Sequence, residues 1–218
     1  MKEIRTLLLL GGTWHDFDGF SAFVETILKP LGCRVECTRE LDRLNSLPEE
    51  GFDLVLKYTC FSETLENGAP APVRFTDAHA GPLARWVAGG GAFLPVHCAT
   101  VSCQSSPLLR GLIGGTFLGH PPAFDVAVCP MATSHPVTAG VGMFCGRDEL
   151  YIHDMEPGVA VHMVAMDRGV AHPMAWTRSE GRGRICYVAP GHDGQVWNLP
   201  PYRLLLAQAA RWVLGSKK

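Results

Sequence analysis

Gly89-Gly90-Gly91-Ala92-Phe93-Leu94-Pro95-Val96-His97-Cys98-Ala99-Thr100 is the stretch that decides the predicted fold. A glycine-rich turn leads into a short apolar strand, and the strand ends abruptly where a helix is expected to begin. In open α/β folds, chemistry gathers at the carboxyl ends of such strands. A strand that stops at a reactive side chain is also how a nucleophile elbow is built. The stretch therefore predicts a buried strand over 92–96, with His97 and Cys98 at a functional sheet edge.

The residues before this stretch alternate between apolar strands and amphipathic helices. Apolar residues recur at helical spacing from Phe20 to Leu31, with Asp18 as the expected N-cap and Gly32 as the expected end. A second helix is expected over 80–87. Strands are expected at 6–10, 33–38 and 52–58. The order strand, helix, strand, strand, helix, strand predicts a parallel sheet covered by helices on both faces.

The second half of the chain is richer in strand patterns. Short strands separated by Gly, Pro and Asp are expected at 124–128, 149–152, 159–166, 174–177 and 184–188. A helix is expected over 100–113, where Pro107 fits only near a first turn or a break. A closing helix is expected over 202–214, ending at Gly215. The segment 65–74 is rich in Gly and Pro and is expected to be an exposed loop.

Composition narrows the class of protein. The chain has 218 residues, 47% of them hydrophobic, which suits one α/β domain over residues 1–218. The formal net charge of -2 offers no basic excess, so no nucleic-acid partner is expected. No apolar run approaches the roughly 18 residues that span a membrane, and the run at 7–10 is too short for a signal peptide. Eight cysteines without a CxxC pair suggest reduced thiols and a cytoplasmic protein, and a homo-oligomer is compatible with the sequence.

Five segments spread over most of the chain combine small-residue turns with histidines and carboxylates. They are Gly11-Gly12-Thr13-Trp14-His15-Asp16; Gly90-Gly91-Ala92-Phe93-Leu94-Pro95-Val96-His97; Gly114-Gly115-Thr116-Phe117-Leu118-Gly119-His120-Pro121; His135-Pro136-Val137-Thr138-Ala139-Gly140 with Asp148-Glu149-Leu150-Tyr151; and Pro173-Met174-Ala175-Trp176 with Gly181-Arg182-Gly183-Arg184 and Gly191-His192-Asp193. In this order and spacing they resemble the trehalose-utilisation (ThuA-like) family.

That resemblance carries expectations for both fold and function. It implies a class I glutamine-amidotransferase-like fold, which is an α/β, flavodoxin-like three-layer sandwich. The central sheet is expected to be mostly parallel, with extra β-strands in the second half. The resemblance also implies a small-molecule sugar ligand and a role in sugar metabolism, with trehalose or a related keto-disaccharide as the substrate.

Three residues are expected to be catalytic. The resemblance places His97 where amidotransferase relatives carry their nucleophilic cysteine, and an imidazole there can act as acid, base or metal ligand. His192 follows the last long strand beside a glycine that permits close approach to a ligand. Consecutive residues on a strand face opposite sides, so only one of Asp148 and Glu149 is expected to face the site. We expect that residue to be Glu149.

Five more residues are expected to bind the substrate. They are Trp14, His15, His120, Tyr151 and Asp193. His15 lies beyond the first strand, at the same carboxyl edge as the catalytic histidine if the sheet is parallel. The indole of Trp14 suits the mixed faces of a sugar, and Tyr151 shares the expected strand face of Glu149. A two-carboxylate, glycosidase-like arrangement needs Asp193 or Asp16 as the partner of Glu149.

The same loops carry donors for a borderline metal ion. The donors are His15, His97, His120, Glu149 and His192. Imidazole and carboxylate suit zinc, although these ligands come from distant segments and have no short spacing signature. A divalent metal such as zinc is therefore an alternative to metal-free acid–base chemistry, and the cofactor stays unassigned.

Three functions remain open at this point. The first is an enzyme that acts on trehalose or a related keto-disaccharide by histidine acid–base chemistry, and we favour it. The second is a non-catalytic sugar-binding or regulatory domain, in which the same residues only hydrogen-bond hydroxyl groups. The third is a Cys98-dependent amidase or peptidase-like hydrolase, which needs a thiolate whose pKa is lowered by a helix N-terminus or a nearby base.

Overall fold

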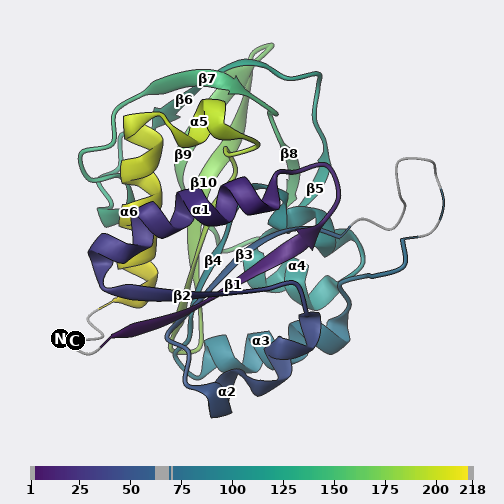
Figure 1. The fold of residues 1–218 in the computed structure, drawn as a ribbon. Coiled ribbons are helices and arrows are strands. Elements are labelled where there is room, and N and C mark those ends of the chain that lie inside the picture. The colour runs from purple at the N-terminus through teal and green to yellow at the C-terminus, as the bar shows by residue number, and fades with distance from the viewer. Residues whose placement is uncertain (1–2, 62–68, 70, 216–218) are drawn as a thin grey trace.

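The computed structural model describes residues 3–61, 69 and 71–215. Its centre is a nine-stranded sheet of order β2-β1-β3-β4-β11-β10-β9-β6-β7 (Figure 1). Neighbouring strands from β2 to β11 are parallel, and those from β11 to β7 are antiparallel. Strands β5 and β8 form a separate antiparallel pair. The strands are β1 (Ile4–Gly12), β2 (Cys33–Thr38), β3 (Leu54–Cys60), β4 (Ala92–Pro95), β5 (Gly115–Gly119), β6 (Phe124–Pro130), β7 (Phe144–Asp148), β8 (Ile152–Met155), β9 (Ala160–Asp167), β10 (Val170–Glu180) and β11 (Gly183–Val188).

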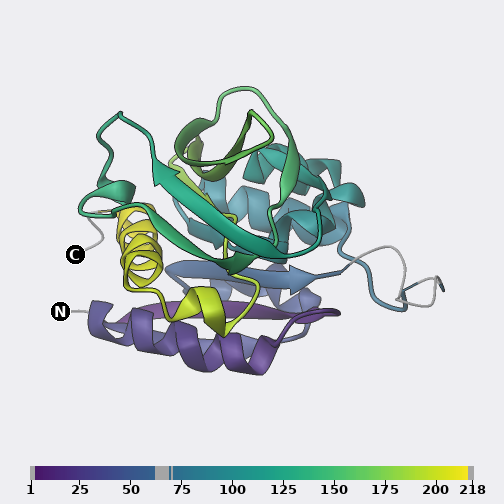
Figure 2. The ribbon, with the colours of Figure 1, turned by 90° about the horizontal axis from the view of Figure 1, so that it is seen from above.

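Helices cover both faces of the sheet (Figures 1 and 2). Helices α1 (Phe17–Leu28) and α6 (Pro200–Leu214) pack on one face, and α3 (Asp77–Ala88) and α4 (Pro107–Ile113) pack on the other. The shorter helical segments are α2 (Leu47–Glu50), α5 (Gly194–Trp197) and the 3-10 turns η1 (Lys29–Leu31), η2 (Leu41–Ser46), η3 (His97–Gln104) and η4 (Pro136–Thr138). The expected α/β sandwich, with a parallel sheet and extra strands in the second half, is confirmed. Among the described residues, every helix is too short or too polar to cross a lipid bilayer.

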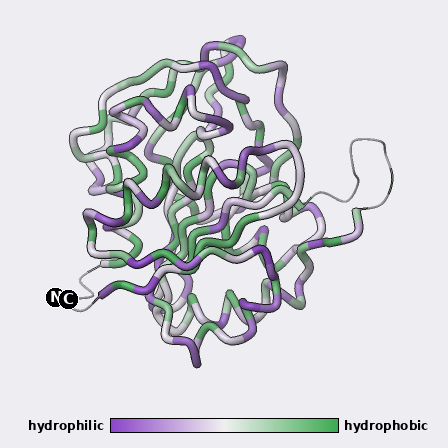
Figure 3. Tube along the Cα trace, viewed as in Figure 1, coloured by the Kyte–Doolittle hydropathy of each residue, from purple (hydrophilic) through white to green (hydrophobic). Residues whose placement is uncertain are grey.

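The core lies along the parallel strands, which are apolar on both faces. All seven residues of β3 are buried, and the run Leu7-Leu8-Leu9-Leu10 fills the middle of β1. Figure 3 shows hydrophobic residues concentrated along these central strands. Strands covered by helices on both sides need such continuous apolar runs. The burial of these runs places the strand ends, and the loops that follow them, at a fixed edge of the molecule.

Two predicted helix boundaries in the first half differ from the structure. The N-cap of α1 is Asp16 and not Asp18, because the Asp16 carboxylate accepts the N–H of Gly19 at 2.8 Å. The helix expected over 100–113 is wrong as one element. It is divided into η3 and α4 before Pro107, which has no N–H to donate and therefore begins the second helix.

Several strand predictions in the second half need correction. The strand expected at 149–152 is wrong, since Glu149 to Tyr151 connect β7 to β8 and only Ile152 belongs to a strand. Strands β5 and β7 were not expected at all. The loop expected at 65–74 lies mostly outside the described residues. The remaining strands appear with their ends shifted by a few residues.

Candidate functional site

Four loops that follow strands bring four side chains together. His15 follows β1, His97 follows β4, Glu149 follows β7 and His192 follows β11. One ligand-type atom from each residue lies within 4.8 Å of those of the other three. We call these four residues the histidine–glutamate cluster. The carboxyl ends of the parallel strands supply all three histidines, which is where open α/β sheets place their sites.

His97 is held in a rare backbone conformation at the end of its strand. Its φ of 44° lies in the left-handed region, which is uncommon for a residue other than glycine. The side chain is 0% exposed, and its Nδ1 lies 2.7 Å from the carbonyl oxygen of Ala189. Because a carbonyl only accepts, Nδ1 is the donor, and in the neutral ring Nε2 carries the lone pair. That Nε2 lies 3.5 Å from Oε2 of Glu149.

His15 repeats this arrangement from another strand. Its Nδ1 lies 3.0 Å from the carbonyl oxygen of Thr13, so its Nε2 also carries a lone pair. Nε2 is buried and has no hydrogen-bond partner among the described residues. Burial, followed by the nearby charge of His97, lowers the pKa of His15 to about 3. The ring is therefore neutral at ordinary pH.

The loop that carries His192 is fixed from two sides. The carboxylate of Asp148 accepts the backbone N–H groups of Gly191 at 2.8 Å and His192 at 3.1 Å. The hydroxyl of Tyr58 donates to the carbonyl oxygens of the same two residues. Gly191 has a φ of 133°, and a Cβ there would lie 2.5 Å from the hydroxyl of Tyr202. Only glycine fits this position, so the loop presents the imidazole of His192 in one direction.

Glu149 is the centre of the charge distribution. Its Oε2 lies 3.2 Å from Nδ1 of His192, and its Oε1 lies 3.6 Å from Nε2 of His120. Burial acts to raise the pKa of Glu149, but the close imidazoles of His192 and His97 outweigh it and hold the pKa below its ordinary value. In return, contact with Glu149 raises the pKa of His192 against the effect of burial. The carboxylate is therefore ionised, and imidazole nitrogens of His97, His120 and His192 face it.

A cavity of about 430 Å³ opens beside the cluster. Its lining residues are Trp14, His15, Cys60, Val101, Gln104, Phe117, His120, Glu149 and Tyr151. His15 and Glu149 belong to both the cluster and the cavity wall. The ring of Tyr151 packs on His97 with centroids 4.2 Å apart, while Trp14 is 55% exposed at the rim. The volume falls within the range of small-ligand sites.

Most of the residues predicted for the site meet here. The predicted catalytic residues are in the cluster, and His120, Tyr151 and Trp14 line the cavity. Asp193 has a different place, because its carboxylate accepts the N–H of Gln195 at 2.7 Å and caps α5. The five predicted metal donors divide into the cluster of four and His120, which contacts the other oxygen of Glu149.

Cys98 lacks the surroundings of a nucleophile. It is fully buried beneath the cluster, and burial raises the pKa of its thiol well above the usual range. A nucleophilic cysteine needs the opposite shift, toward the thiolate. The structure therefore favours a packing role for Cys98 over the amidase or peptidase alternative.

Two residues near the site were not anticipated. Asp148 was expected to face away from the site, yet it holds the His192 loop, because the chain turns out of the sheet immediately after it. Lys57 lies buried in β3 and donates to Thr59 Oγ1, to Ser102 Oγ and to the carbonyl oxygen of Ala99 in η3. The sequence signal for Lys57 was a charge inside an otherwise apolar strand. Asp148 had no comparable signal, since its role depends on the later loop.

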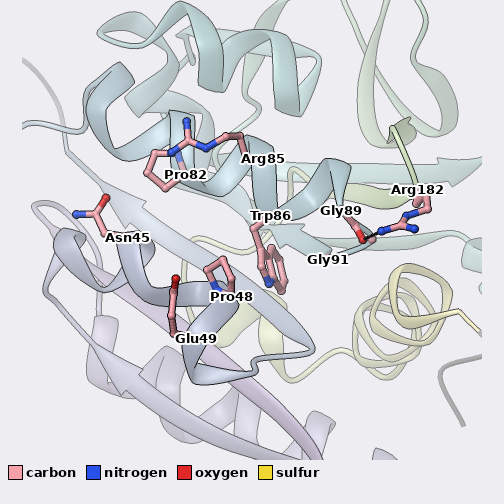
Figure 4. A pocket seen from close by; sticks show the side chains of 10 residues that line it. Asn45, Pro48, Glu49, Pro82, Arg85, Trp86, Gly89, Gly91 and Arg182 are labelled. Carbon is pink, nitrogen blue, oxygen red and sulfur yellow. Dashed lines mark hydrogen bonds between the residues drawn. The ribbon is translucent and has the colours of Figure 1, made fainter.

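A larger cavity, of about 840 Å³, lies at the opposite ends of the strands. Figure 4 shows Trp86, Arg85 and Arg182 around the glycine turn that precedes β4. Arg182 donates to the carbonyl oxygen of Gly89 at 2.8 Å, which fixes that turn. None of the cluster residues lines this cavity. Arg182 is used structurally, so the histidine–glutamate cluster is the stronger candidate for chemistry.

Comparison with known proteins agrees with this architecture. A family model described as trehalose utilisation (ThuA) matches residues 17–213. A ThuA-like protein from Parabacteroides merdae superposes with a TM-score of 0.76 at 17% identity, covering 98% of this chain and 90% of that one. A second, from Bacteroides uniformis, superposes with a TM-score of 0.71 at 19% identity, covering 96% and 91%.

A more distant likeness is to part of a larger enzyme. A β-galactosidase from Rahnella sp. R3 superposes with a TM-score of 0.66 at 14% identity, covering 95% of this chain but 30% of that one. At these identities the three structures show a shared fold. A search of curated proteins found no match.

Proposed function

This chain belongs to the trehalose-utilisation (ThuA) family, and from that premise we propose that it is a sugar-metabolising enzyme whose catalytic centre is the histidine–glutamate cluster. The proposed substrate is trehalose or a related disaccharide in which one hydroxyl has been oxidised to a ketone. The family supports the choice of a sugar. The cluster supports the choice of catalysis over binding alone.

One observation carries the proposal of catalysis. His15 Nε2, His97 Nε2 and His192 Nδ1 are buried and lack a well-directed hydrogen bond within the described residues, and the last two face only the carboxylate of Glu149. An unpaired buried polar group costs about 1–3 kcal/mol, and folded proteins satisfy most such groups. Three of them around one carboxylate, next to a cavity, favour an arrangement kept for chemistry.

The cavity wall suits a sugar bound beside this centre. Trp14 and Phe117 offer apolar faces of the kind that pack against sugar C–H groups. His120 donates from Nδ1 to the carbonyl oxygen of Pro121, which leaves its Nε2 free in the cavity. We propose that His120 exchanges protons with the substrate, since it is the half-exposed imidazole next to Glu149.

A ketone is the group on which the cluster would act most effectively. Removal of a proton from the carbon next to a ketone places negative charge on the carbonyl oxygen. Lone pairs on the buried imidazoles favour this step either as bases or by holding a cation that polarises the carbonyl. Unmodified trehalose has no carbonyl group, so we expect the keto derivative to be the better substrate.

The test is to monitor, by NMR, the turnover of trehalose and of its ketone derivative. The protein should consume the ketone, and Glu149→Gln should lower the rate by about 100-fold or more, because it removes the carboxylate that contacts the imidazoles of His97, His120 and His192. Glu25→Gln is the matched control, since Glu25 is exposed on α1, and its rate should equal that of the unaltered protein. Cys98→Ala should retain turnover.

Two results would contradict the proposal. One is binding of the disaccharide without any conversion by the unaltered protein, which would favour a sugar-binding domain. The other is loss of activity in Cys98→Ala with Glu149→Gln unaffected, provided that circular dichroism shows both variants to be folded.

A further inference from the structure

The histidine–glutamate cluster brings four groups that can donate an electron pair to a cation close to one another. The Nδ1 atoms of His15 and His97 donate to backbone carbonyls, so in the neutral rings both Nε2 atoms carry lone pairs. Glu149 adds an acceptor oxygen 3.5 Å from Nε2 of His97. A single proton can join only one pair of these atoms, whereas four donor atoms converge.

We propose that the histidine–glutamate cluster is a binding site for one divalent first-row transition-metal ion, with zinc as its representative. The ligands are Nε2 of His15, Nε2 of His97, Oε2 of Glu149 and Nδ1 of His192. One ion satisfies every unpaired nitrogen of the cluster at once. The role of the ion in catalysis rests on the proposed function, whereas the binding of the ion does not.

The spacing of the atoms fits such an ion. Ligands about 2.1 Å from zinc in a tetrahedral arrangement are about 3.4 Å apart. The separations from Oε2 of Glu149 are 3.2 Å to Nδ1 of His192 and 3.5 Å to Nε2 of His97, and one ligand atom from each of the four residues lies within 4.8 Å of the others. Three imidazoles and one carboxylate form a borderline donor set, which suits zinc and its neighbours better than calcium or magnesium.

The surroundings of the ligands are those of a prepared metal site. Histidine ligands usually donate their other ring nitrogen to a carbonyl or carboxylate, which fixes the ring and its tautomer. His15 does so to Thr13, and His97 does so to Ala189. Asp148 holds the backbone of His192 and the N–H of Glu149 together. Two ligand-bearing loops therefore share one carboxylate as their support.

The position of the site leaves one side open for a substrate. His97 is the fully buried member of the cluster, while His15 and Glu149 also line the cavity of about 430 Å³. An ion on these ligands faces the cavity, as catalytic metals with a free coordination position do. His120, which contacts the other oxygen of Glu149, remains free to transfer protons.

Titration with metal alone tests the site. The full-length protein is stripped with a chelator and titrated with zinc chloride by calorimetry, and with cobalt chloride by visible absorption. We expect one equivalent of zinc to bind, and cobalt to give the absorption bands of a low-coordinate nitrogen and oxygen site. Absence of stoichiometric binding would overturn the proposal.

Single substitutions test whether zinc binds at the histidine–glutamate cluster. His97→Ala and Glu149→Gln should each weaken zinc affinity by at least about 100-fold, which exceeds the 10–100-fold effect of losing an outer support. His15→Gln gives the same test at a less buried position if His97→Ala fails to fold. His172→Gln and Glu25→Gln, at positions outside the cluster, should bind as the unaltered protein does. Equal affinity in all folded variants would show that zinc binds elsewhere.

The outcomes separate this inference from the proposed function. A protein that binds zinc at the cluster but converts neither sugar contradicts the proposed function and supports the metal site. A chelator-treated protein that still consumes the ketone at full rate, and binds no zinc, contradicts the metal site and leaves the proposed function in place.

Discussion

At the scale of single residues, the buried lysine of β3 is the most unusual feature outside the cluster. Lys57 is 0% exposed and is surrounded by hydroxyls, a carbonyl and the ring of Phe75, and no carboxylate of the described residues forms an ion pair with it. Burial lowers its pKa to about 8, and the nearby thiols of Cys103, Cys98 and Cys60 act in the opposite direction. Its hydrogen bond to Ala99 ties β3 to η3, the segment that begins with His97.

The lowered pKa of Lys57 predicts a particular pH dependence of stability. Between pH 8 and the ordinary lysine value of 10.5 the unfolded chain holds a proton that the folded chain has released, so Lys57 makes the free energy of unfolding rise with pH in that window. The gain across the window is at most about 3 kcal/mol. Urea unfolding at several pH values should show the free energy of unfolding of the protein rising relative to that of Lys57→Met as pH rises through this window.

The comparison with Lys57→Met is needed because the three thiols also titrate in alkali. Their own titration is present in both proteins, so the difference reports Lys57 together with its interaction with these thiols. Parallel stability curves for the two proteins from pH 7 to pH 10 would contradict a lowered pKa for Lys57.

At the scale of elements, the site depends on loops and not on the strands that precede them. The β7–β8 connection carries Glu149, the β11–α5 connection carries His192, and Asp148 joins the two by three backbone hydrogen bonds. Backbone N–H groups on a buried carboxylate form stronger bonds than neutral pairs do. The geometry of the cluster is therefore set by the last residue of β7.

Asp148→Asn should loosen the site without removing a ligand. The amide keeps one acceptor oxygen, but its NH2 group cannot accept an N–H, so at least one of the three hydrogen bonds is lost. We expect a loss of stability of about 1–3 kcal/mol and a fall in zinc affinity of about 10–100-fold. Thermal unfolding and zinc calorimetry measure the two effects.

A structural role in the fold alone would give a different result for Asp148→Asn. Stability would fall while the folded variant bound zinc with unchanged affinity. That outcome would assign Asp148 to the fold and not to the positioning of His192.

The elements also show how far sequence reasoning reaches. Continuous apolar runs predicted β1, β3 and β4, and the break after Val96 located His97, because these signals are local. The sequence predicts a strand at Glu149 where the structure has a loop, because that loop is held by the hydrogen bonds of Asp148 to Gly191 and His192, more than 40 residues away. Strands β5 and β7 are short, and they depend on pairing with β8 and β6, which a short segment of sequence does not reveal. The sequence therefore did not predict them.

At the scale of the whole molecule, one sheet joins the parallel and antiparallel halves. Strand β11 pairs with β4 on one side and with β10 on the other. The parallel and antiparallel halves therefore share one continuous sheet at this strand. Helix α6 packs across β4 and β11 from the end of the chain. The site draws on both halves, because Glu149 belongs to the antiparallel side and His15 to the parallel side.

This continuity predicts a single cooperative unfolding transition. Urea curves followed by circular dichroism and by tryptophan fluorescence should coincide, as they do in two-state domains. Zinc at about 100 times its dissociation constant should raise the free energy of unfolding by about 2.7 kcal/mol. Two separated transitions would mean that the halves unfold as independent units.

The central place of β11 has a consequence for synthesis on the ribosome. The strand that joins the two halves of the sheet follows the ten other described strands in sequence, and it begins at Gly183. Until it emerges from the exit tunnel, β4 and β10 each present an unpaired edge, and such edges can join other chains. The nascent chain is therefore exposed to edge-to-edge aggregation from the synthesis of β4 until β11 has emerged.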